Sequence, residues 1–258
     1  MNPIITLTTD FGTRDGFVGA MKGRILSIAP HATIVDITHE VPAQDVLQAS
    51  WTLYRSTIQF PAESIHIAVI DPGVGSERPA ILVKSEGRWY VGPDNGIFTR
   101  IIEQCGTDEI YEINKQTDLW QAHSSFDGLA LFAPVGAHLA AGLKPNQIGS
   151  PPQKTLKILR APSPEASERS IDGEIILFDR FGNAITNVMQ YHIEALLNTQ
   201  PTVMCKSQRF PKVSFYHEGE LGSGVSIINS DGNLEISVPN GSAREQYDLE
   251  IGDKVSIK

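Results

Sequence analysis

The feature of this sequence that most constrains the fold is a change of pattern just past the middle of the chain. Up to about residue 142, short β-branched runs alternate with segments of helical periodicity. Strands separated by helices are typical of a largely parallel sheet covered by helices on both faces, so we expect an N-terminal α/β domain. The strands are expected at 4–8, 33–37, 65–70, 80–83 and 89–91, and the helices at 15–28, 45–54, 96–104 and 129–141.

The rest of the chain differs in composition and in the pattern of its predicted elements. Residues 146–170 are rich in proline and polar residues, which is typical of a linker. Beyond them, short strands with turn signals favour a small β-barrel or sandwich, with a brief helical piece near Ile193. These strands are expected at 173–178, 184–188, 224–229, 234–238 and 254–257. The sequence thus predicts an α/β domain over 1–145, a linker over 146–170 and a smaller all-β barrel domain over 171–258.

Composition excludes several classes of protein. The 258 residues include 21 Lys and Arg against 30 Asp and Glu, a formal charge of −9 that would repel nucleic acid. Apolar runs fall short of the roughly 20 residues of a spanning helix, so we expect no membrane partner, and the N-terminus lacks the basic region of a signal peptide. We expect a cytoplasmic protein. Cys105 and Cys205 lie a hundred residues apart, which excludes a disulfide scaffold and a zinc ribbon.

Two acidic residues directly follow predicted strands, where α/β proteins place functional groups. Asp10 lies in Thr-Asp-Phe-Gly between a strand and a helix and could present its carboxylate to a ribose diol. Asp15 could cap or flank the start of that helix. Asp71 opens a Gly/Pro-built loop that ends at Arg78. The loop is either a strained turn with a surface salt bridge or a pre-organised carboxylate–guanidinium pair, and we favour the pair.

Two further segments could bind or cap. Asp127 and Gly128 precede a helix of small and apolar residues, so Asp127 is either its N-cap or part of an anion or water site at the helix N-terminus. The turn 178–183 suits a hairpin, yet Phe181 beside Asn183 could stack on a purine and hydrogen-bond its edge. The turns at 229–232 and 240–244 are interpreted from their residues alone as structural.

Six segments together resemble the signature blocks of a known family. In chain order they are TDFGTRDGFVGAMKG, IDPGVGSER, GPDNG, SSFDGLALFAPVGAHLA, FDRFGNAITNV and NSDGNLEISVPNGSA. They are similar to blocks of the S-adenosyl-L-methionine hydroxide adenosyltransferases, which are related to the fluorinase and chlorinase, and they cover nearly the whole chain. The resemblance implies an N-terminal α/β domain, a C-terminal β-barrel and a homotrimer with active sites between subunits.

The resemblance also implies a reaction. Water or hydroxide attacks the ribose C5′ of S-adenosyl-L-methionine, which yields adenosine and L-methionine without a cofactor or a metal. Asp71 and Arg78 match two members of the family's Asp–Arg–His set. Asp127 stands where the family has its His, the Arg-Asp pair that follows in the family is absent, and His123 lies four positions away. We therefore predict Asp71, Arg78 and Asp127 as catalytic residues.

The substrate-binding residues carried over from the family lie in both halves of the chain. Asp10 would hold the ribose hydroxyls, Asn183 and Phe181 would contact adenine, and the last turn, at 240–243, would add an adenine contact. Gly128 matches the chlorinase-like residue at the halide position. The predicted binding set is Asp10, Asp15, Phe126, Gly128, Asp179, Phe181, Asn183, Ser230 and Ala243, of which Asp15, Asp179 and Ser230 would hold the methionine end.

Three alternatives remain open at this level. Asp127 could mark a lost active site in a non-catalytic protein that binds adenosine or S-adenosyl-L-methionine. A halogenase is less favoured, because the halide enzymes carry Tyr where this chain has Asp71, and a carboxylate would repel an incoming anion. A metal-assisted nucleoside hydrolase would instead use Asp10, Asp15 and Asp71 as oxygen ligands of a hard cation.

Overall fold

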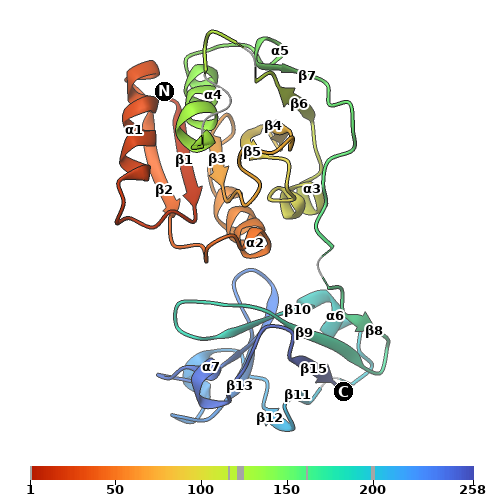
Figure 1. The fold of residues 1–258 in the computed structure, drawn as a ribbon. Coiled ribbons are helices and arrows are strands. Elements are labelled where there is room, and N and C mark those ends of the chain that lie inside the picture. Colours follow the sequence, from red (N-terminus) through yellow and green to blue (C-terminus); the bar gives the residue numbers. More distant parts are fainter. Residues whose placement is uncertain (1, 116, 121–124, 161, 199–200) are drawn as a thin grey trace. The chain divides into compact units, whose positions relative to one another are not determined.

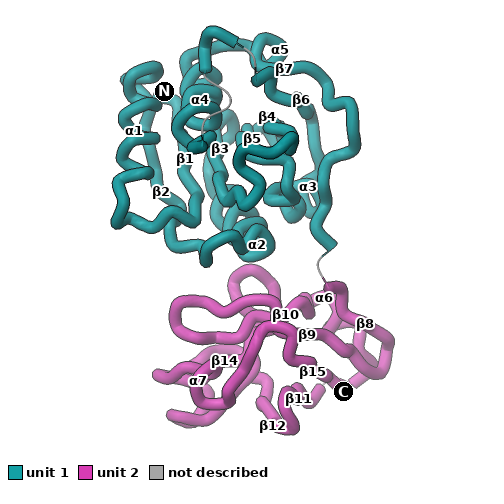
Figure 2. Tube along the Cα trace, in the orientation of Figure 1, with its two compact units in different colours: residues 1–160 teal, residues 161–258 magenta. Residues whose placement is uncertain are grey.

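The chain divides into two compact units, residues 1–160 and 161–258 (Figure 2). The computed structural model describes residues 2–115, 117–120, 125–160, 162–198 and 201–258. The division falls inside the stretch that the sequence predicts as a linker. Each unit has a hydrophobic core of its own.

In unit 1 the described residues form a seven-stranded sheet in the order β2-β1-β3-β5-β4-β6-β7 (Figure 1). The neighbours from β2 to β5 pair in parallel, and those from β5 to β7 pair antiparallel. The predicted α/β class is confirmed. The strands are β1 (Ile4–Thr9), β2 (Thr33–Thr38), β3 (Ile65–Val69), β4 (Ala80–Ser85), β5 (Arg88–Pro93), β6 (Glu109–Ile113) and β7 (Gly149–Ser150).

Helices cover both faces of this sheet (Figure 1). One core contains residues of α1 (Phe17–Ile28) and α4 (Ala133–Ala140), and the other contains residues of α2 (Val46–Thr57) and α3 (Thr99–Cys105). Ile65 and Ile67 of β3 point into the first core, whereas Ala68 points into the second. A strand buried on both faces must be apolar throughout, which explains the continuous run in β3.

The antiparallel half of the sheet begins with a tight hairpin. Glu86 and Gly87 connect β4 to β5 with φ angles of 46° and 73°. Two left-handed residues in a two-residue loop make a type I′ turn, whose twist matches that of the flanking strands. The parallel arrangement predicted from the sequence therefore holds for β2, β1, β3 and β5, and ends at this turn.

In unit 2 the described strands form an antiparallel sheet in the order β12-β11-β15-β9-β10-β14-β13, with β8 beside β9. The bridge between Lys212 and Ser226 joins the chain after β12 to β13, so the sheet curls into a nearly closed barrel, as predicted. The strands are β8 (Glu165–Ala166), β9 (Ile171–Phe178), β10 (Ala184–Met189), β11 (Val203–Cys205), β12 (Gln208–Phe210), β13 (Val225–Ile228), β14 (Asn233–Ser237) and β15 (Lys254–Ile257).

The remaining helices are short. They are η1 (Gly128–Phe132) and α5 (Pro145–Ile148) in unit 1 and α6 (Gln190–Glu194), η2 (Tyr216–Glu218) and α7 (Ala243–Gln246) in unit 2. Of the helices in the described part of the chain, none has the length and apolar character needed to cross a membrane.

Candidate active site

Unit 1 contains a cavity of about 290 Å³ where β1 and β3 end. This is the edge at which parallel sheets of α/β proteins place their functional groups. Five predicted site residues line the cavity: Asp10, Asp71, Phe126, Asp127 and Gly128. The described lining also includes Phe11, Gln44, Val69, Pro72, Val74 and Ser125.

Asp71 and Arg78 form a buried pair across the loop that joins β3 to β4. Arg78 Nε donates to Asp71 Oδ1 at 2.9 Å, and Arg78 Nη2 donates to Asp71 Oδ2. The two side chains are 5% and 9% exposed. Such a two-point contact fixes both the position and the plane of the carboxylate. Of the two interpretations of this loop, the pre-organised pair agrees with the two-point contact and the burial of both side chains, and the surface salt bridge does not.

Asp127 joins this pair from the other side. It precedes η1 (Gly128–Phe132), a π-helical turn that runs into α4, and its side chain makes no capping bond in the described part of the chain. Instead, Asp127 Oδ2 accepts a hydrogen bond of 2.6 Å from Arg78 Nη2, with the Asp127 side chain 8% exposed. One guanidinium thus holds two carboxylates, which leaves one negative charge in excess.

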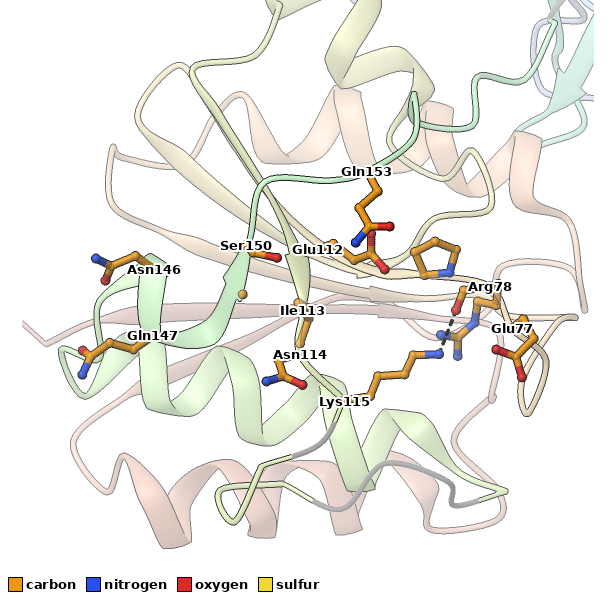
Figure 3. A pocket seen from close by; sticks show the side chains of 12 residues that line it. Glu77, Arg78, Glu112, Ile113, Asn114, Lys115, Asn146, Gln147, Ser150 and Gln153 are labelled. Atoms are coloured by element: carbon orange, nitrogen blue, oxygen red, sulfur yellow. Dashed lines mark hydrogen bonds between the residues drawn. The ribbon is translucent and has the colours of Figure 1, made fainter.

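The residues of this cluster line two different cavities. Asp71 and Asp127 line the cavity of 290 Å³, whereas Arg78 is among the residues that line a second cavity of about 490 Å³ (Figure 3). In this second cavity Lys115 Nζ donates to the Arg78 carbonyl at 2.8 Å. Burial, with a contribution from Arg78, lowers the pKa of Lys115. The described lining of the first cavity thus contains carboxylates, whereas Arg78 and Lys115 belong to the lining of the second.

Asp10 lies at the end of β1 with one oxygen already engaged. Its Oδ2 accepts a hydrogen bond of 2.8 Å from the backbone N–H of Gln44, which has a φ of 66°. Asp15 is exposed and flanks α1, whose N-cap is Gly16. The described lining of the cavity includes Asp10 and Asp71 but not Asp15. The three acids of the metal-site alternative are thus not brought together there.

An aromatic cluster forms one wall. Phe126 packs edge-on against Phe11 and Phe17, with ring centroids 5.4 and 5.1 Å apart. A Cβ on Gly128 would lie 2.6 Å from the Phe126 ring and 3.2 Å from Met21 Sδ. A side chain at position 128 would therefore require the Phe126 ring to shift.

Sequence reasoning missed three of the lining residues in particular. Phe11 lies in the same motif as Asp10, and Val74 lies in the same motif as Asp71. The inclusion of all residues of those motifs could therefore have found both. Gln44 lies after β2 with no motif around it, and its place depends on the contact with Asp10.

In unit 2, a cavity of about 560 Å³ contains three predicted residues: Asp179, Phe181 and Asn183. Asp179 Oδ1 accepts from the backbone N–H groups of Phe181 and Asn183, both at 2.9 Å, and Oδ2 accepts from Asn183 Nδ2 at 2.8 Å. The carboxylate therefore shapes the turn. The Phe181 ring is 75% exposed, so its face is open to a stacking partner.

The other two predicted residues of unit 2 lie elsewhere. Ser230 is exposed in the turn between β13 and β14, and Ala243 is buried at the start of α7. In the described lining, the last turn contributes Asn240 and Gly241. Tyr216, which the sequence did not single out, also lines the cavity and donates to Glu235 at 2.8 Å, and burial raises its pKa.

Metal ligands do not gather in the described residues: no three His, Cys, Asp or Glu side chains there could hold a metal ion together. His123, which the sequence places near Asp127, lies outside the described residues.

Fold and site together define a two-part protein, with a carboxylate-lined cavity at the strand ends of an α/β unit and a small antiparallel barrel after it. The chain belongs to the S-adenosyl-L-methionine (SAM) hydroxide adenosyltransferase family: the model of its N-terminal domain matches residues 5–149, and that of its C-terminal domain matches residues 173–256.

Relatives match along almost the whole chain. It is 36% identical to the (R)-S-adenosyl-L-methionine hydrolase of Methanocaldococcus jannaschii, over 98% of this chain and 95% of that protein. It is 28% identical to a fluorinase of an Actinoplanes species, over 99% of this chain and 97% of that protein. A crystal structure of an uncharacterized conserved protein from Thermotoga maritima superposes with a TM-score of 0.90 at 32% identity and covers 98% of this chain and 99% of that one.

Proposed function

We propose that this chain is an enzyme that hydrolyses S-adenosyl-L-methionine to adenosine and L-methionine. The observation that carries the proposal is the arrangement of Asp71 and Asp127 on the shared Arg78, in one cavity with Asp10. The membership of the chain in the family and its likeness to the hydrolase of Methanocaldococcus jannaschii support the choice of substrate.

The reaction needs a nucleophile more than it needs an acid. The sulfonium of the substrate is a good leaving group, whereas water must be oriented and deprotonated. The water oxygen attacks C5′, the C5′–S bond breaks, and its electron pair stays on sulfur as the thioether of methionine. The proton of the water passes to Asp71 or Asp127, which face the cavity. Arg78 holds both carboxylates in place.

The remaining residues would hold the substrate. Asp10 would use its second oxygen for the ribose hydroxyls, since the first binds Gln44. Phe126 and Gly128 would shape the wall. In unit 2, the Asn183 side chain and the Phe181 ring would contact adenine, beside the last turn at 240–243. Asp15, Asp179 and Ser230 would hold the methionine end.

We further propose a homotrimer in which the unit 1 cavity of one subunit faces the unit 2 cavity of the next. Exposed apolar side chains on the linings of both cavities support an interface there. Val74 is 43% exposed in unit 1, and Tyr216 is 45% exposed in unit 2. We expect the enzyme in the cytoplasm.

Product analysis tests the proposed function. The purified chain is incubated with S-adenosyl-L-methionine in buffer with EDTA and chloride, and the products are separated by chromatography. We expect adenosine and methionine from the wild type and from Asp172→Asn, a control at an exposed aspartate of β9. Asp71→Asn should lose at least about 100-fold in rate.

Other outcomes would identify the alternatives. A chlorinated nucleoside would indicate a halogenase, and activity that EDTA abolishes would indicate a metal-assisted enzyme. Tight binding of adenosine without turnover would refute hydrolysis and indicate a binding protein.

A further inference from the structure

The Gly-Pro-Asp-Asn-Gly segment, residues 92–96, contacts the chain where the loop from Asp71 to Arg78 begins. Asn95 Nδ2 donates to the carbonyl of Ile70 at 2.7 Å, and Asn95 Oδ1 accepts from the backbone N–H of Ile97 at 3.1 Å. Ile70 is the residue before Asp71. Both ends of the Asn95 side chain are therefore occupied by backbone groups, one of which belongs to the peptide that carries Asp71.

This contact continues a strand ladder beyond its end. The pairing of β3 with β5 reaches Ile67 and Val91. Past that point the Asn95 amide takes the place of a strand neighbour for the Ile70 carbonyl. A buried carbonyl needs such a partner, so the contact fixes the direction in which the chain leaves β3.

The other end of the loop is held in a similar way. Lys115, just after β6, spans part of the second cavity, and its Nζ donates to the carbonyl of Arg78 at 2.8 Å (Figure 3). Between these two anchors, the loop has short-range bonds of its own. Val74 N–H donates to the Asp71 carbonyl at 3.2 Å, and Ser76 N–H donates to the Gly73 carbonyl at 3.1 Å.

We propose that Asn95 and Lys115 are positioning residues: by holding the carbonyls of Ile70 and Arg78, they set the place of Asp71 and Arg78 relative to the substrate. The inference rests on the proposed function. Local turn bonds shape the loop, but contacts from outside are needed to fix where it lies on the sheet. A displacement of about 1 Å at a reacting group can lower a rate about 100-fold, so loss of either anchor should lower kcat.

Variants with a matched control test this. Asn95→Asp places a carboxylate oxygen against the Ile70 carbonyl, and Lys115→Met removes the donor to Arg78. Asn187→Asp is the control, because Asn187 likewise accepts from a backbone N–H, that of Glu174, and donates to a carbonyl, that of Pro162.

The kinetic result expected is a split between kcat and KM. Asn95→Asp and Lys115→Met should lower kcat by about 10- to 100-fold and leave KM within about threefold, whereas Lys115→Arg, which keeps a donor, should recover most of the rate. The control should lower Tm and leave kcat near the wild-type value. An unchanged kcat in both variants, or a rise in KM at constant kcat, would overturn the inference.

Amide hydrogen exchange gives a readout that does not depend on turnover. Both variants should exchange the Val74 and Ser76 amides at least about tenfold faster than the wild type does, and the control should not. A fall in kcat without faster exchange would overturn the inference. If the wild type itself forms no adenosine, the proposed hydrolysis fails, while exchange still decides whether Asn95 and Lys115 anchor the loop.

Discussion

The removal of Arg78 should destabilise the protein far more than the removal of one of the carboxylates that it binds. Asp71 and Asp127 contact the same nitrogen of Arg78, so their nearest oxygens lie within about 5 Å of each other. Two unit charges at this distance repel by about 3 kcal/mol at an effective dielectric constant of about 20. All three side chains are less than a tenth exposed, so water screens this repulsion poorly.

The magnitudes differ between the variants. Arg78→Met leaves two buried carboxylates unpaired, and we expect a loss of about 3–5 kcal/mol in the free energy of unfolding. Asp127→Asn keeps an oxygen acceptor for Arg78 and leaves Asp71 paired, so its loss should be about 1 kcal/mol. The double variant combines Arg78→Met with Asp127→Asn, so the repulsion between the two carboxylates is gone. This protein should be about 3 kcal/mol more stable than Arg78→Met alone.

Urea denaturation of the four proteins at pH 8 measures these differences. Chromatography of adenosine follows activity in parallel, and we expect no recovery of rate in the double variant. A double variant less stable than Arg78→Met would refute the reasoning, since it would show that the two carboxylates do not repel once the guanidinium is gone.

Two more predictions concern buried groups of unit 1. Burial lowers the pKa of His66 to about 3, whereas histidine in an unfolded chain titrates near 6.5. The unfolded state therefore binds more protons below pH 6.5, stability falls as the pH drops, and by pH 4.5 the wild type should lose about 2–3 kcal/mol more than His66→Gln. Urea denaturation of both proteins at pH 8 and at pH 4.5 checks this, and equal losses of stability in the wild type and in His66→Gln would contradict it. Gly128→Ala should push the Phe126 ring into the cavity and weaken adenosine binding about tenfold or more in calorimetry; an unchanged affinity would show that the ring does not border the ligand.

Much of the fold could be predicted from the sequence because its signals are local. The apolar run of β3 and the helical period of α1 each describe one element, and both elements lie where they are expected. The antiparallel half of the sheet depends on the hairpin at Glu86 and Gly87, whose consequence for strand direction is not visible in strand periodicity. β6 is half-buried and was missed because its hydrophobic pattern is weak.

The site could be predicted in part for the same reason. Asp10 and Asp71 can be identified as candidates because each follows a predicted strand, and Arg78 belongs to the same loop as Asp71. The contact between Arg78 and Asp127 joins residues 49 positions apart, and neither the pattern of the helix after Asp127 nor its capping preference reveals that the carboxylate turns away from the helix. Such a contact follows from packing of α4 and η1 on the sheet, which the sequence does not show locally.

The charge balance of the cavity bears on the choice of nucleophile. When a neutral water attacks a sulfonium, positive charge leaves the sulfur and develops on the attacking oxygen. Under the proposed mechanism this oxygen lies beside Asp71 and Asp127, so the carboxylates stabilise the transition state more than the ground state. A halide would bring negative charge to the same place, against two carboxylates that share one guanidinium. An aspartate at position 127, where the family resemblance places a histidine, thus favours water over halide and remains compatible with hydrolysis.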